Sequence, residues 1–579
     1  MISGLKLLFL FAVFLGQNAI VELQASHYVD EKLQQYANIN NVDISINQPY
    51  RTAFHFQPAK NWMNDPNGPM IYKGTYHFFY QYNPKGAVWG NIVWGHSTSK
   101  DLVNWVPHGT AMFPSQPSDI KGIWSGSATI LPGGTPAILF TGVDKLDNQL
   151  QNLALPKNLS DPYLKQWVKS PRNPLMSPSP NNQINASSFR DPTTAWIGHD
   201  GQWRVTIGSK FNSRGVAILY KSKDFVHWIK MKEPLHSAPG TGMWECPDFY
   251  PVSVNRGWDI QKPVIGKGIK YVMKLSLDET RHDYYTVGEY DIVKDKYIPD
   301  PGSVDGDSGL RYDYGKFYAS KTFFDSAKNR RVLWGWVNES STDEQNVYRG
   351  WSGLQGFPRT IYLDKSRKQL VQWPVEEIEK LRSNAFHLPT SKVLRQGAAI
   401  GVSGITPAQA DVDISFKVSD FSKAEKLDPS WTNPQLLCSK MGHSVKGGLG
   451  PFGLLVLASK GMKEYTSVFF RIFKDHNNKL VVLMCSDQSR SSLVPDYDKT
   501  TYGAFLDVNP LGEELSLRSL IDHSIVESFG GKGKCCITAR VYPTLAINGA
   551  AHLYAFNKGS QTVTVSKFSA WSMKKANIN

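Results

Sequence analysis

Apolar residues along this chain fall into short runs separated by turn-forming residues. Runs such as 76–80 (Tyr-His-Phe-Phe-Tyr) and 216–220 (Val-Ala-Ile-Leu-Tyr) are rich in aromatic and β-branched residues and are bounded by Gly, Pro, Asn and Asp. Runs of this length and composition are typical of β-strands. Only residues 372–381 show a convincing short helical pattern, with Pro374 near the start and apolar residues at three-residue steps. The pattern therefore predicts an all-β protein.

A repeat of about 60 residues divides the first two thirds of the chain. Asp101 and Trp105 bound one copy of a five-residue motif, Asp224 and Trp228 bound a second, and a looser copy ends at Trp167. The three tryptophans are 62 and then 61 residues apart. A period of this size, with several short strands in each unit, is typical of a β-propeller. We predict five blades over residues 48–370; the alternative is a chance similarity of three Asp…Trp pairs.

The last third of the chain has strand-like runs without this period. They alternate as expected for sheets with one buried face, which indicates a β-sandwich over residues 388–579. Residues 371–387 are expected to form a helical linker between the two parts. The strand-like runs cover residues 410–418, 452–458, 468–473, 480–485 and 515–528.

The N-terminus has the pattern of a secretory signal peptide. Lys6 precedes an apolar run over residues 7–15 that is too short to span a bilayer. We predict a signal peptide over residues 1–25, with cleavage near Ala25; the alternative is a buried N-terminal helix. No other segment is long and apolar enough to be a membrane span. The mature protein is therefore expected to be secreted and soluble.

Sequons and cysteines agree with export. N-glycosylation sequons begin at Asn158, Asn185 and Asn338. The chain has five cysteines, too few for disulfides to carry a fold of this length. Cys438 and Cys485 lie in strand-like runs and are the expected pair, although the connectivity cannot be proved from sequence. The other three cysteines would be free or unassigned.

The chain is basic, with a net charge of +14 and an isoelectric point near 9.2. Its Lys and Arg residues are scattered, and no basic helix, RNA-binding signature or zinc-finger spacing is present. Nucleic acid is therefore not an expected partner. In an exported protein an acidic extracellular polysaccharide is the more natural electrostatic partner. The alternative is simply a soluble, well-charged surface.

Residues 62–68 (Trp-Met-Asn-Asp-Pro-Asn-Gly) hold the first candidate catalytic carboxylate. Pro66 biases Asp65 towards extended geometry, and Gly68 permits a sharp turn. Asp65 would then point into whatever the strand faces. The alternative is an Asx-turn, in which Asp65 bonds only its local backbone.

Distinctive motifs continue at roughly matching intervals along the repeat. Asp191 lies in an Arg-Asp-Pro motif at 190–192, and Glu245 lies in Trp-Glu-Cys-Pro-Asp at 244–248. The segments 124–127 and 311–314 occupy the second and fifth units. Equivalent positions on the innermost strands of a propeller converge on its central channel. The three carboxylates, Asp65 included, are therefore expected to meet at one mouth of it.

Three carboxylates among aromatic residues suit cleavage of a glycosidic bond. One would attack the anomeric carbon and another would protonate the departing oxygen, a separation of roughly 5–5.5 Å giving retention of configuration. Crowding of like charges should raise the pKa of the acid. The alternative is a calcium site. There is no EF-hand spacing, and the motifs carry Trp and Arg rather than further oxygen ligands, so no metal or cofactor is expected.

These motifs resemble those of glycoside hydrolase family 32, and within it the plant cell-wall (acid) invertase and fructan exohydrolase group. The likeness runs from about residue 51 to residue 571 and includes a stretch at 517–529 similar to the sandwich signature of that family. It implies a five-bladed propeller joined to a β-sandwich. By position, Asp65 would be the nucleophile that attacks C2 of a fructosyl unit and Glu245 the general acid/base. Asp191 would hold fructose hydroxyls and support the transition state.

The resemblance also implies a set of substrate-binding residues. The positions that match the fructose pocket are Trp62, Asn64, Gln81, Trp89, Trp124, Ser125 and Arg190. For Trp89 and Trp124, ordinary core packing is the alternative. Intact Trp62 and Asn64 argue against a fructosyltransferase, in which this motif commonly drifts.

The substrate is left open between sucrose and fructan. In the family, an aspartate that helps to hold the glucose half of sucrose separates invertases from exohydrolases, and Asp278 matches it. Its partner lysine is replaced by Arg281, which keeps the charge but has a larger planar head. Proline after Cys246 looks like the cell-wall type. We therefore expect a β-fructofuranosidase that hydrolyses sucrose, with a fructan exohydrolase or a non-catalytic carbohydrate-binding protein as the alternatives.

Overall fold

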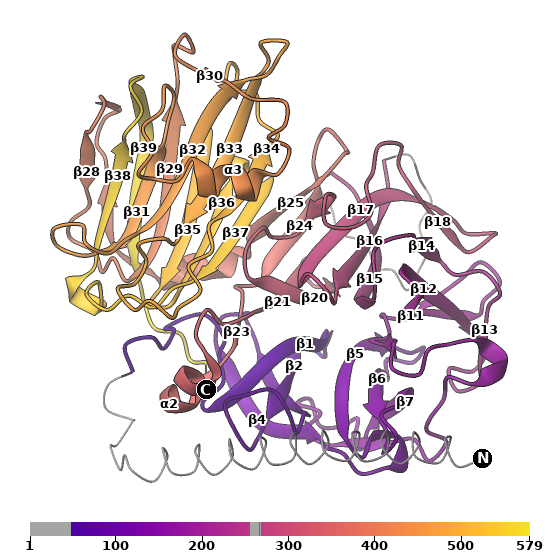
Figure 1. The fold of residues 1–579 in the computed structure, drawn as a ribbon. Helices are drawn as coiled ribbons and strands as arrows, with labels where there is room; N and C mark the ends of the chain where they lie inside the picture. Colours follow the sequence, from indigo (N-terminus) through magenta and orange to yellow (C-terminus); the bar gives the residue numbers. More distant parts are fainter. Residues whose placement is uncertain (1–47, 255–265, 267, 579) are drawn as a thin grey trace, which may run out of the picture.

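The chain folds into two all-β units, as Figure 1 shows. The computed structural model describes residues 48–254, 266 and 268–578, so the predicted signal peptide lies outside the described residues. The first unit is a ring of five blades and the second is a pair of seven-stranded sheets. The predicted five-bladed propeller followed by a β-sandwich is confirmed. No helix among the described residues is long and apolar enough to cross a membrane.

Each blade is a sheet whose first strand lies towards the centre of the ring. Blades 1 and 2 consist of β1 (Asn61–Tyr72), β2 (Thr75–Asn83), β3 (Val93–Ser99), β4 (Trp105–Met112), β5 (Gly122–Ile130), β6 (Pro136–Val143), β7 (Gln149–Pro156) and β8 (Trp167–Lys169). Blade 3 consists of β9 (Phe189–Arg190), β10 (Trp196–Ile197), β11 (Trp203–Phe211), β12 (Arg214–Ser222), β13 (Trp228–Lys230) and β14 (His236–Ala238).

Blades 4 and 5 complete the ring. Blade 4 consists of β15 (Trp244–Val252), β16 (Lys270–Leu277), β17 (His282–Asp291), β18 (Lys296–Pro299) and β19 (Leu310–Arg311). Blade 5 consists of β20 (Phe317–Asp325), β21 (Arg330–Val337), β23 (Leu354–Gln355), β24 (Arg359–Leu363) and β25 (Leu370–Pro374). Short helical segments join these strands at η1 (Pro117–Asp119), η2 (Pro180–Asn182) and α2 (Asp343–Arg349).

The 62-residue repeat corresponds to the turn before the outer strand of a blade. Trp105, Trp167 and Trp228 are the first residues of β4, β8 and β13. The aspartate of each motif closes the turn: Asp101 Oδ1 accepts from the N–H groups two and three residues on, at 3.0 and 2.8 Å. Asp224 makes the same two bonds at 2.9 and 2.8 Å. The repeat is therefore an Asx-turn that starts the rim strand.

A late segment of the chain closes the ring onto blade 1. The strand β22 (Trp351–Ser352) pairs in parallel with the start of β1. The following Gly353 has φ +76°, and a Cβ there would lie 1.9 Å from the carbonyl oxygen of Met63. Only glycine permits this approach. The segment between β21 and β23 of blade 5 therefore fixes the strand that carries Asp65.

Four inner strands carry the same irregularity at the same level. In each of them two consecutive residues oppose a single residue of the neighbouring strand, which is a β-bulge. The bulged pairs are Asn64–Asp65 in β1, Trp124–Ser125 in β5, Cys246–Pro247 in β15 and Ala319–Ser320 in β20. A bulge bends the strand and changes where its side chains point. Every blade but the third therefore presents a bulge at the same mouth of the channel.

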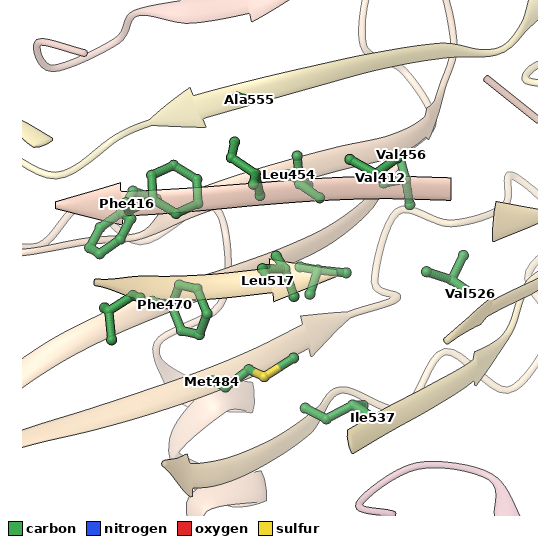
Figure 2. Close-up of a cluster of buried hydrophobic side chains, with 14 of the residues drawn as sticks. Val412, Phe416, Leu454, Val456, Phe470, Met484, Leu517, Val526, Ile537 and Ala555 are labelled. Atoms are coloured by element: carbon green, nitrogen blue, oxygen red, sulfur yellow. The ribbon is translucent and has the colours of Figure 1, made fainter. Parts of the chain in front are cut away.

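The sandwich is built from two sheets with a shared apolar core. One sheet contains β26 (Arg382–His387), β27 (Lys392–Leu394), β29 (Gln409–Lys417), β35 (Leu515–Asp522), β36 (Ile525–Gly530), β37 (Cys535–Arg540) and β39 (Val563–Met573). The other contains β28 (Ala399–Gly401), β30 (Glu425–Lys426), β31 (Phe452–Ala458), β32 (Thr466–Lys474), β33 (Leu480–Asp487), β34 (Tyr502–Leu506) and β38 (His552–Asn557). Figure 2 shows side chains of both sheets, among them Phe416 and Phe470, meeting in this core. Two further turns, η4 (Gly531–Gly533) and η5 (Asn548–Ala550), are 3-10 helical.

Three sequence-based expectations for this region need correction. The run 515–528 is a hairpin, because the chain reverses at His523, which has φ +57°. The linker predicted over 371–387 is helical only at η3 (Glu376–Leu381), between β25 and β26. Its three-residue apolar steps match the period of a 3-10 helix. Cys438 and Cys485 do form the predicted disulfide, but Cys438 lies in the helix α3 (Pro434–Lys440).

The predicted glycosylation sites differ in accessibility. Asn158 and Asn185 are exposed. Asn338 is partly buried, and its side-chain oxygen accepts a hydrogen bond from the N–H of Glu339 at 2.8 Å. Modification at all three positions stays a prediction.

A buried charge network joins the two units. Glu527 and Asp522 of the sandwich hairpin contact His55, each at 2.9 Å, just before the first propeller strand. Arg359 of blade 5 reaches Glu527 at 2.6 Å and Asp313 at 2.9 Å. All five side chains are fully buried. The stretch 517–529 therefore includes the side chains that lock the sandwich to the propeller.

Burial and charge pairing act against each other in this network. Burial lowers the pKa of His55, but hydrogen bonds to Asp522 and Glu527 outweigh it and raise the pKa to about 9. Burial raises the pKa of Glu527, but Arg359 and His55 lower it to about 2. The stabilisation from His55 is complete below its unfolded pKa of about 6.5, and that from Glu527 is complete above about 4.5. The network therefore contributes fully in mildly acidic solution.

Replacing Arg359 by methionine should destabilise the folded protein strongly. The substitution leaves Asp313 and Glu527 buried without their guanidinium partner, at a cost of about 3–5 kcal/mol. Thermal unfolding followed by circular dichroism would measure it. The control is Lys121→Met, since Lys121 pairs with Asp147 at 46% and 71% exposure and should change stability by less than about 1 kcal/mol. Equal melting temperatures for the two variants would contradict the role of the network.

Candidate active site

The three predicted carboxylates meet where the inner strands carry their bulges. Asp65 lies in the bulge of β1, Glu245 directly precedes that of β15, and Asp191 directly follows β9. Cys246 lies among them: its N–H donates to Asp191 at 2.9 Å, and its sulfur is 3.6 Å from Asp191 and 3.7 Å from Asp65. Cys246 and Asp191 both have positive φ, at +44° and +68°. Strained backbone of this kind is frequent at active sites.

Asp65 is held by a chain of uncharged donors. The indole N–H of Trp62 donates to Asn64 Oδ1 at 3.0 Å, and Asn64 Nδ2 donates to Asp65 at 3.0 Å. Asn64 Nδ2 also donates to Gln81 at 2.9 Å, Gln81 donates to Ser125 at 2.6 Å, and Ser125 donates to Asp65 at 2.6 Å. The Asp65 carboxylate therefore receives a hydrogen bond on each oxygen. These contacts favour a functional position over the Asx-turn alternative.

The charge of Asp65 is controlled by opposing effects. Burial raises its pKa to about 7, and the neighbouring carboxylates of Asp191 and Glu245 raise it too. Hydrogen bonds from Ser125 and Asn64 act in the opposite direction, because they favour the ionised form. The donors around Asp65 therefore offset part of the effect of burial and favour its ionised form.

Glu245 lies in a different environment, among cations. Arg190 donates twice to Glu245 Oε1, from Nε at 3.0 Å and Nη2 at 2.9 Å. Arg281 contacts Oε2 at 3.3 Å, and the hydroxyl of Tyr318 donates to the same oxygen. Burial raises the pKa of Glu245 while Arg190 lowers it. The raised pKa expected for the acid is thus present, but burial is its largest cause rather than crowding of carboxylates.

Asp278 and Arg281, the two residues predicted to lie beside the glucose half of sucrose, are linked to Glu245. The link to Asp278 is made by Arg190. Arg190 Nη2 also contacts Asp278 Oδ2 at 2.9 Å. Arg281 Nη2 contacts Asp278 Oδ1 at 3.0 Å. The side chains of Asp278 and Arg281 are 32% and 56% exposed, in contrast to the 8% of Arg190. Asp278 is therefore oriented by two guanidinium groups at the open edge of the site.

The aromatic residues divide into packed and accessible rings. Trp62 packs edge-on against Trp336, with ring centroids 5.6 Å apart. Trp89 packs in the same way against Trp124 at 6.0 Å, and Trp89 itself is 56% exposed. An exposed indole supported by a second ring offers a face on which a sugar can stack. For Trp89 this favours a binding position over core packing.

Sequence reasoning missed two residues of the site and placed one motif wrongly. Tyr318 donates to Glu245 and Trp336 packs against Trp62, both from blade 5, whereas the segment 311–314 was predicted there from the repeat. Asp313 of that segment instead contacts Arg359 and Thr538 at the domain interface. The spacing from Glu245 to Tyr318 is longer than the repeat, so periodicity could not find it. A bulge at the start of a strand has no distinct sequence pattern.

Metal ligands do not gather in the part of the chain that the structure describes. Among those residues, no group of three or more His, Cys, Asp or Glu side chains is placed to hold a metal ion. Arg190 and Arg281 occupy the space beside Glu245. The arrangement therefore suits acid–base and nucleophilic chemistry by carboxylates.

Comparison with known families agrees with this geometry. Residues 55–374 match the profile described as "Glycosyl hydrolases family 32 N-terminal domain", and residues 377–572 match "Glycosyl hydrolases family 32 C terminal". The chain belongs to glycosyl hydrolase family 32. It is therefore a glycosidase, and the resemblance noted in its motifs is confirmed.

The names of similar proteins state two different activities, β-fructofuranosidase and fructan exohydrolase. "Beta-fructofuranosidase, insoluble isoenzyme CWINV1" of Arabidopsis thaliana is 62% identical, over 100% of this chain and 99% of that protein. "Fructan 6-exohydrolase" of Beta vulgaris is 61% identical, over 93% and 89%. The crystal structure of fructan 1-exohydrolase IIa from Cichorium intybus has a TM-score of 0.89 at 53% identity, over 92% and 98%. Overall similarity therefore does not separate the two activities.

Replacing Ser125 by alanine should move the acidic limb of the kcat/KM profile to higher pH. The hydrogen bond from Ser125 lowers the pKa of Asp65, so its loss should raise that pKa. If activity requires ionised Asp65, a larger fraction of the enzyme is then inactive at a given acidic pH. The shift should be on the order of one pH unit, measured from initial rates across pH. Ser519→Ala is the control, because the Ser519 hydroxyl bonds a buried serine hydroxyl of the sandwich at 2.9 Å, far from the carboxylates in the fold. An unchanged acidic limb would contradict the assignment of Asp65.

Proposed function

We propose that this glycosidase is a β-fructofuranosidase that hydrolyses sucrose to glucose and fructose by double displacement. The observation that carries the proposal is the contrast between two neighbouring carboxylates. Burial raises the pKa of both groups, but their partners differ. Asp65 receives a hydrogen bond on each oxygen from an uncharged donor, which favours the ionised form of a nucleophile. Glu245 lies beside the open edge, bonded by Arg190, Arg281 and Tyr318, where an acid can reach the leaving group. Two carboxylates in unequal environments are the usual basis of retaining glycosidases.

In the first step Glu245 donates its proton to the glycosidic oxygen. The bond from that oxygen to C2 of the fructosyl unit breaks, and an Asp65 oxygen forms an ester with C2 while glucose departs. In the second step ionised Glu245 takes a proton from water. The resulting hydroxide attacks C2, the ester breaks, and fructose leaves with its original configuration. Asp65 returns to its ionised form and Glu245 to its protonated form.

Asp191 and Arg190 would orient the fructosyl unit and the acid. Asp191 is fixed by the N–H of Cys246 on one side, and its backbone N–H donates to Thr141 Oγ1 at 2.8 Å. It can therefore accept hydroxyls of fructose without moving, which favours a fixed transition-state geometry. Arg190 keeps Glu245 and Asp278 at a constant distance because it bonds both.

The choice of sucrose rests on Asp278. It is partly exposed beside the acid and held by Arg190 and Arg281, which is a suitable place for the leaving glucose. The second candidate is a fructan exohydrolase that releases terminal fructose from inulin or levan. The observation that favours it is Arg281, whose broad guanidinium contacts both Asp278 and Glu245 and reduces the room beside them.

Secretion to the plant cell wall is part of the proposal. The relatives named as insoluble or cell-wall isozymes support it, as does the predicted signal peptide. The acidic wall polysaccharide, suggested by the net charge of +14, stays a prediction.

Asp65→Asn and Glu245→Gln should each lower kcat on sucrose by at least about a thousandfold, because one removes the nucleophile and the other the proton donor. Reducing-sugar release would measure the rates. Asp147→Asn and Glu289→Gln are matched controls at exposed positions of blades 2 and 4. Proton NMR of the first product should show β-fructofuranose. Wild-type rates in either site variant, or inversion at C2, would overturn the mechanism.

Asp278→Ala should separate the two candidate substrates. Loss of a charged hydrogen-bond acceptor costs about 1.5–3 kcal/mol, so kcat/KM on sucrose should fall by about 10–100-fold. The value on inulin or levan should change less than about threefold, because the fructosyl side is intact. Glu279→Ala is the neighbouring control. If the wild type prefers the polymer and Asp278→Ala affects both substrates equally, the exohydrolase is correct.

A further inference from the structure

Two strained bulges lie behind the side chains that surround the acid. In β15, Cys246 and Pro247 oppose the single residue Leu275, and Cys246 has φ +44°. In β20, Ala319 and Ser320 oppose the single residue at 335, and Ala319 has φ +51°. Glu245 directly precedes the first bulge and Tyr318 directly precedes the second. The direction of both side chains therefore depends on how these bulges are held.

A fully buried lysine connects the two bulges. Lys274 Nζ donates to the carbonyl of Cys246 at 2.8 Å and to the carbonyl of Ser320 at 2.6 Å. Its third donor bonds Ser276 Oγ at 3.1 Å. An ammonium group has three N–H donors and no acceptor, so every donor of Lys274 is used. No uncharged side chain could hold two carbonyls of different blades and a hydroxyl with one atom.

A fully buried aspartate, Asp283, binds the backbone N–H groups of the bulge in β20. Asp283 accepts from the N–H of Ala319 at 3.2 Å and from the N–H of Ser320 at 2.8 Å. It also lies 3.6 Å from Lys274 Nζ. Asp283 is opposite Ser276 in the pairing of β16 with β17, so the two charged side chains share one face of blade 4. That face is turned towards blade 5.

We propose that Lys274 and Asp283 form a positioning pair that fixes Glu245 against the hydroxyl of Tyr318. The hydrogen bonds of the pair among the described residues go to backbone groups of the two bulges and to Ser276, so it acts on Glu245 through the bulges. The ion pair is entirely buried, with both side chains at 0% exposure. Such a pair is costly to desolvate and is weak support for stability alone. Here it satisfies four backbone groups that the bulges release from the sheet ladder.

The inference deepens the proposed function, since it rests on Glu245 as the acid. Without the pair, the carbonyl of Cys246 and the N–H groups of β20 would turn towards other partners. Tyr318 would then lose its fixed hydrogen bond to Glu245. Because that bond favours the ionised acid, its loss raises the pKa of Glu245 and moves the alkaline limb of the rate profile upward. Misplacement of the acid by a fraction of an ångström lowers kcat more than KM.

The test uses Lys274→Met, Asp283→Asn and the double variant of the full-length enzyme. Each should lower kcat on sucrose by at least about tenfold and change KM by less than about threefold. The alkaline limb should move up by on the order of half a pH unit. The double variant removes both charges, so its melting temperature should exceed that of Lys274→Met while its kcat stays low. Asp283→Asn keeps the shape and one acceptor, so it remains informative if the lysine variant does not fold.

The control is Lys221→Met, which removes another lysine paired with aspartate, Asp295, away from the inner strands. It should lower the melting temperature and leave kcat and the pH profile unchanged. If the site variants are only less stable, with wild-type kcat per folded molecule and an unmoved alkaline limb, the pair is merely structural and the proposal is wrong. Glu245→Gln separates the two questions: an active Glu245→Gln overturns the proposed function, whereas an inactive one with normal Lys274→Met overturns only the positioning role.

Discussion

The site depends on the pairing of two residues against one on the inner strands of four blades. A regular strand alternates its side chains between its two faces, so consecutive residues such as Asn64 and Asp65 would point apart. The bulge removes that restriction and lets both contribute to the same network. Its cost is backbone strain and unpaired N–H and carbonyl groups. The buried polar side chains around the channel mouth compensate by bonding those groups.

This constraint explains why buried charged side chains lie beneath the candidate active site. Lys274 and Asp283 hold the bulges of blades 4 and 5, and Gln355 donates to the carbonyl of Asn64 at 2.7 Å from the segment that closes the ring. The sandwich contacts the segment just before the first inner strand. Asp522 and Glu527 bind His55, which shortly precedes β1, so the entry of the first strand is fixed by the second unit. The sandwich thus supports the geometry of Asp65 without contacting it.

Sequence patterns found the elements whose cause is local. The tryptophans at 105, 167 and 228 marked three rim strands because each follows an Asx-turn made by neighbouring residues. The helix predicted over 372–381 was partly wrong for two reasons. Apolar residues at steps of three suit a 3-10 helix as well as an α-helix. The first residues of the range belong to the strand β25. The hairpin at His523 was missed because an apolar run continues on both sides of a non-glycine residue with positive φ. Residue propensities for secondary structure do not indicate such a reversal of the chain.

Short patterns along the chain were enough to identify the fold class and the family and to single out three candidate carboxylates, because the residue types of these motifs are distinctive. Asp65, Asp191 and Glu245 could be named from their neighbours in the chain. Tertiary structure alone decided what surrounds them: Ser125 and Gln81 on Asp65, Arg190 and Tyr318 on Glu245, and Asp313 at the interface rather than the site. The physical reason is that charge and proton affinity depend on contacts across blades. Those contacts are set by bulges and burial, which no single stretch of sequence contains.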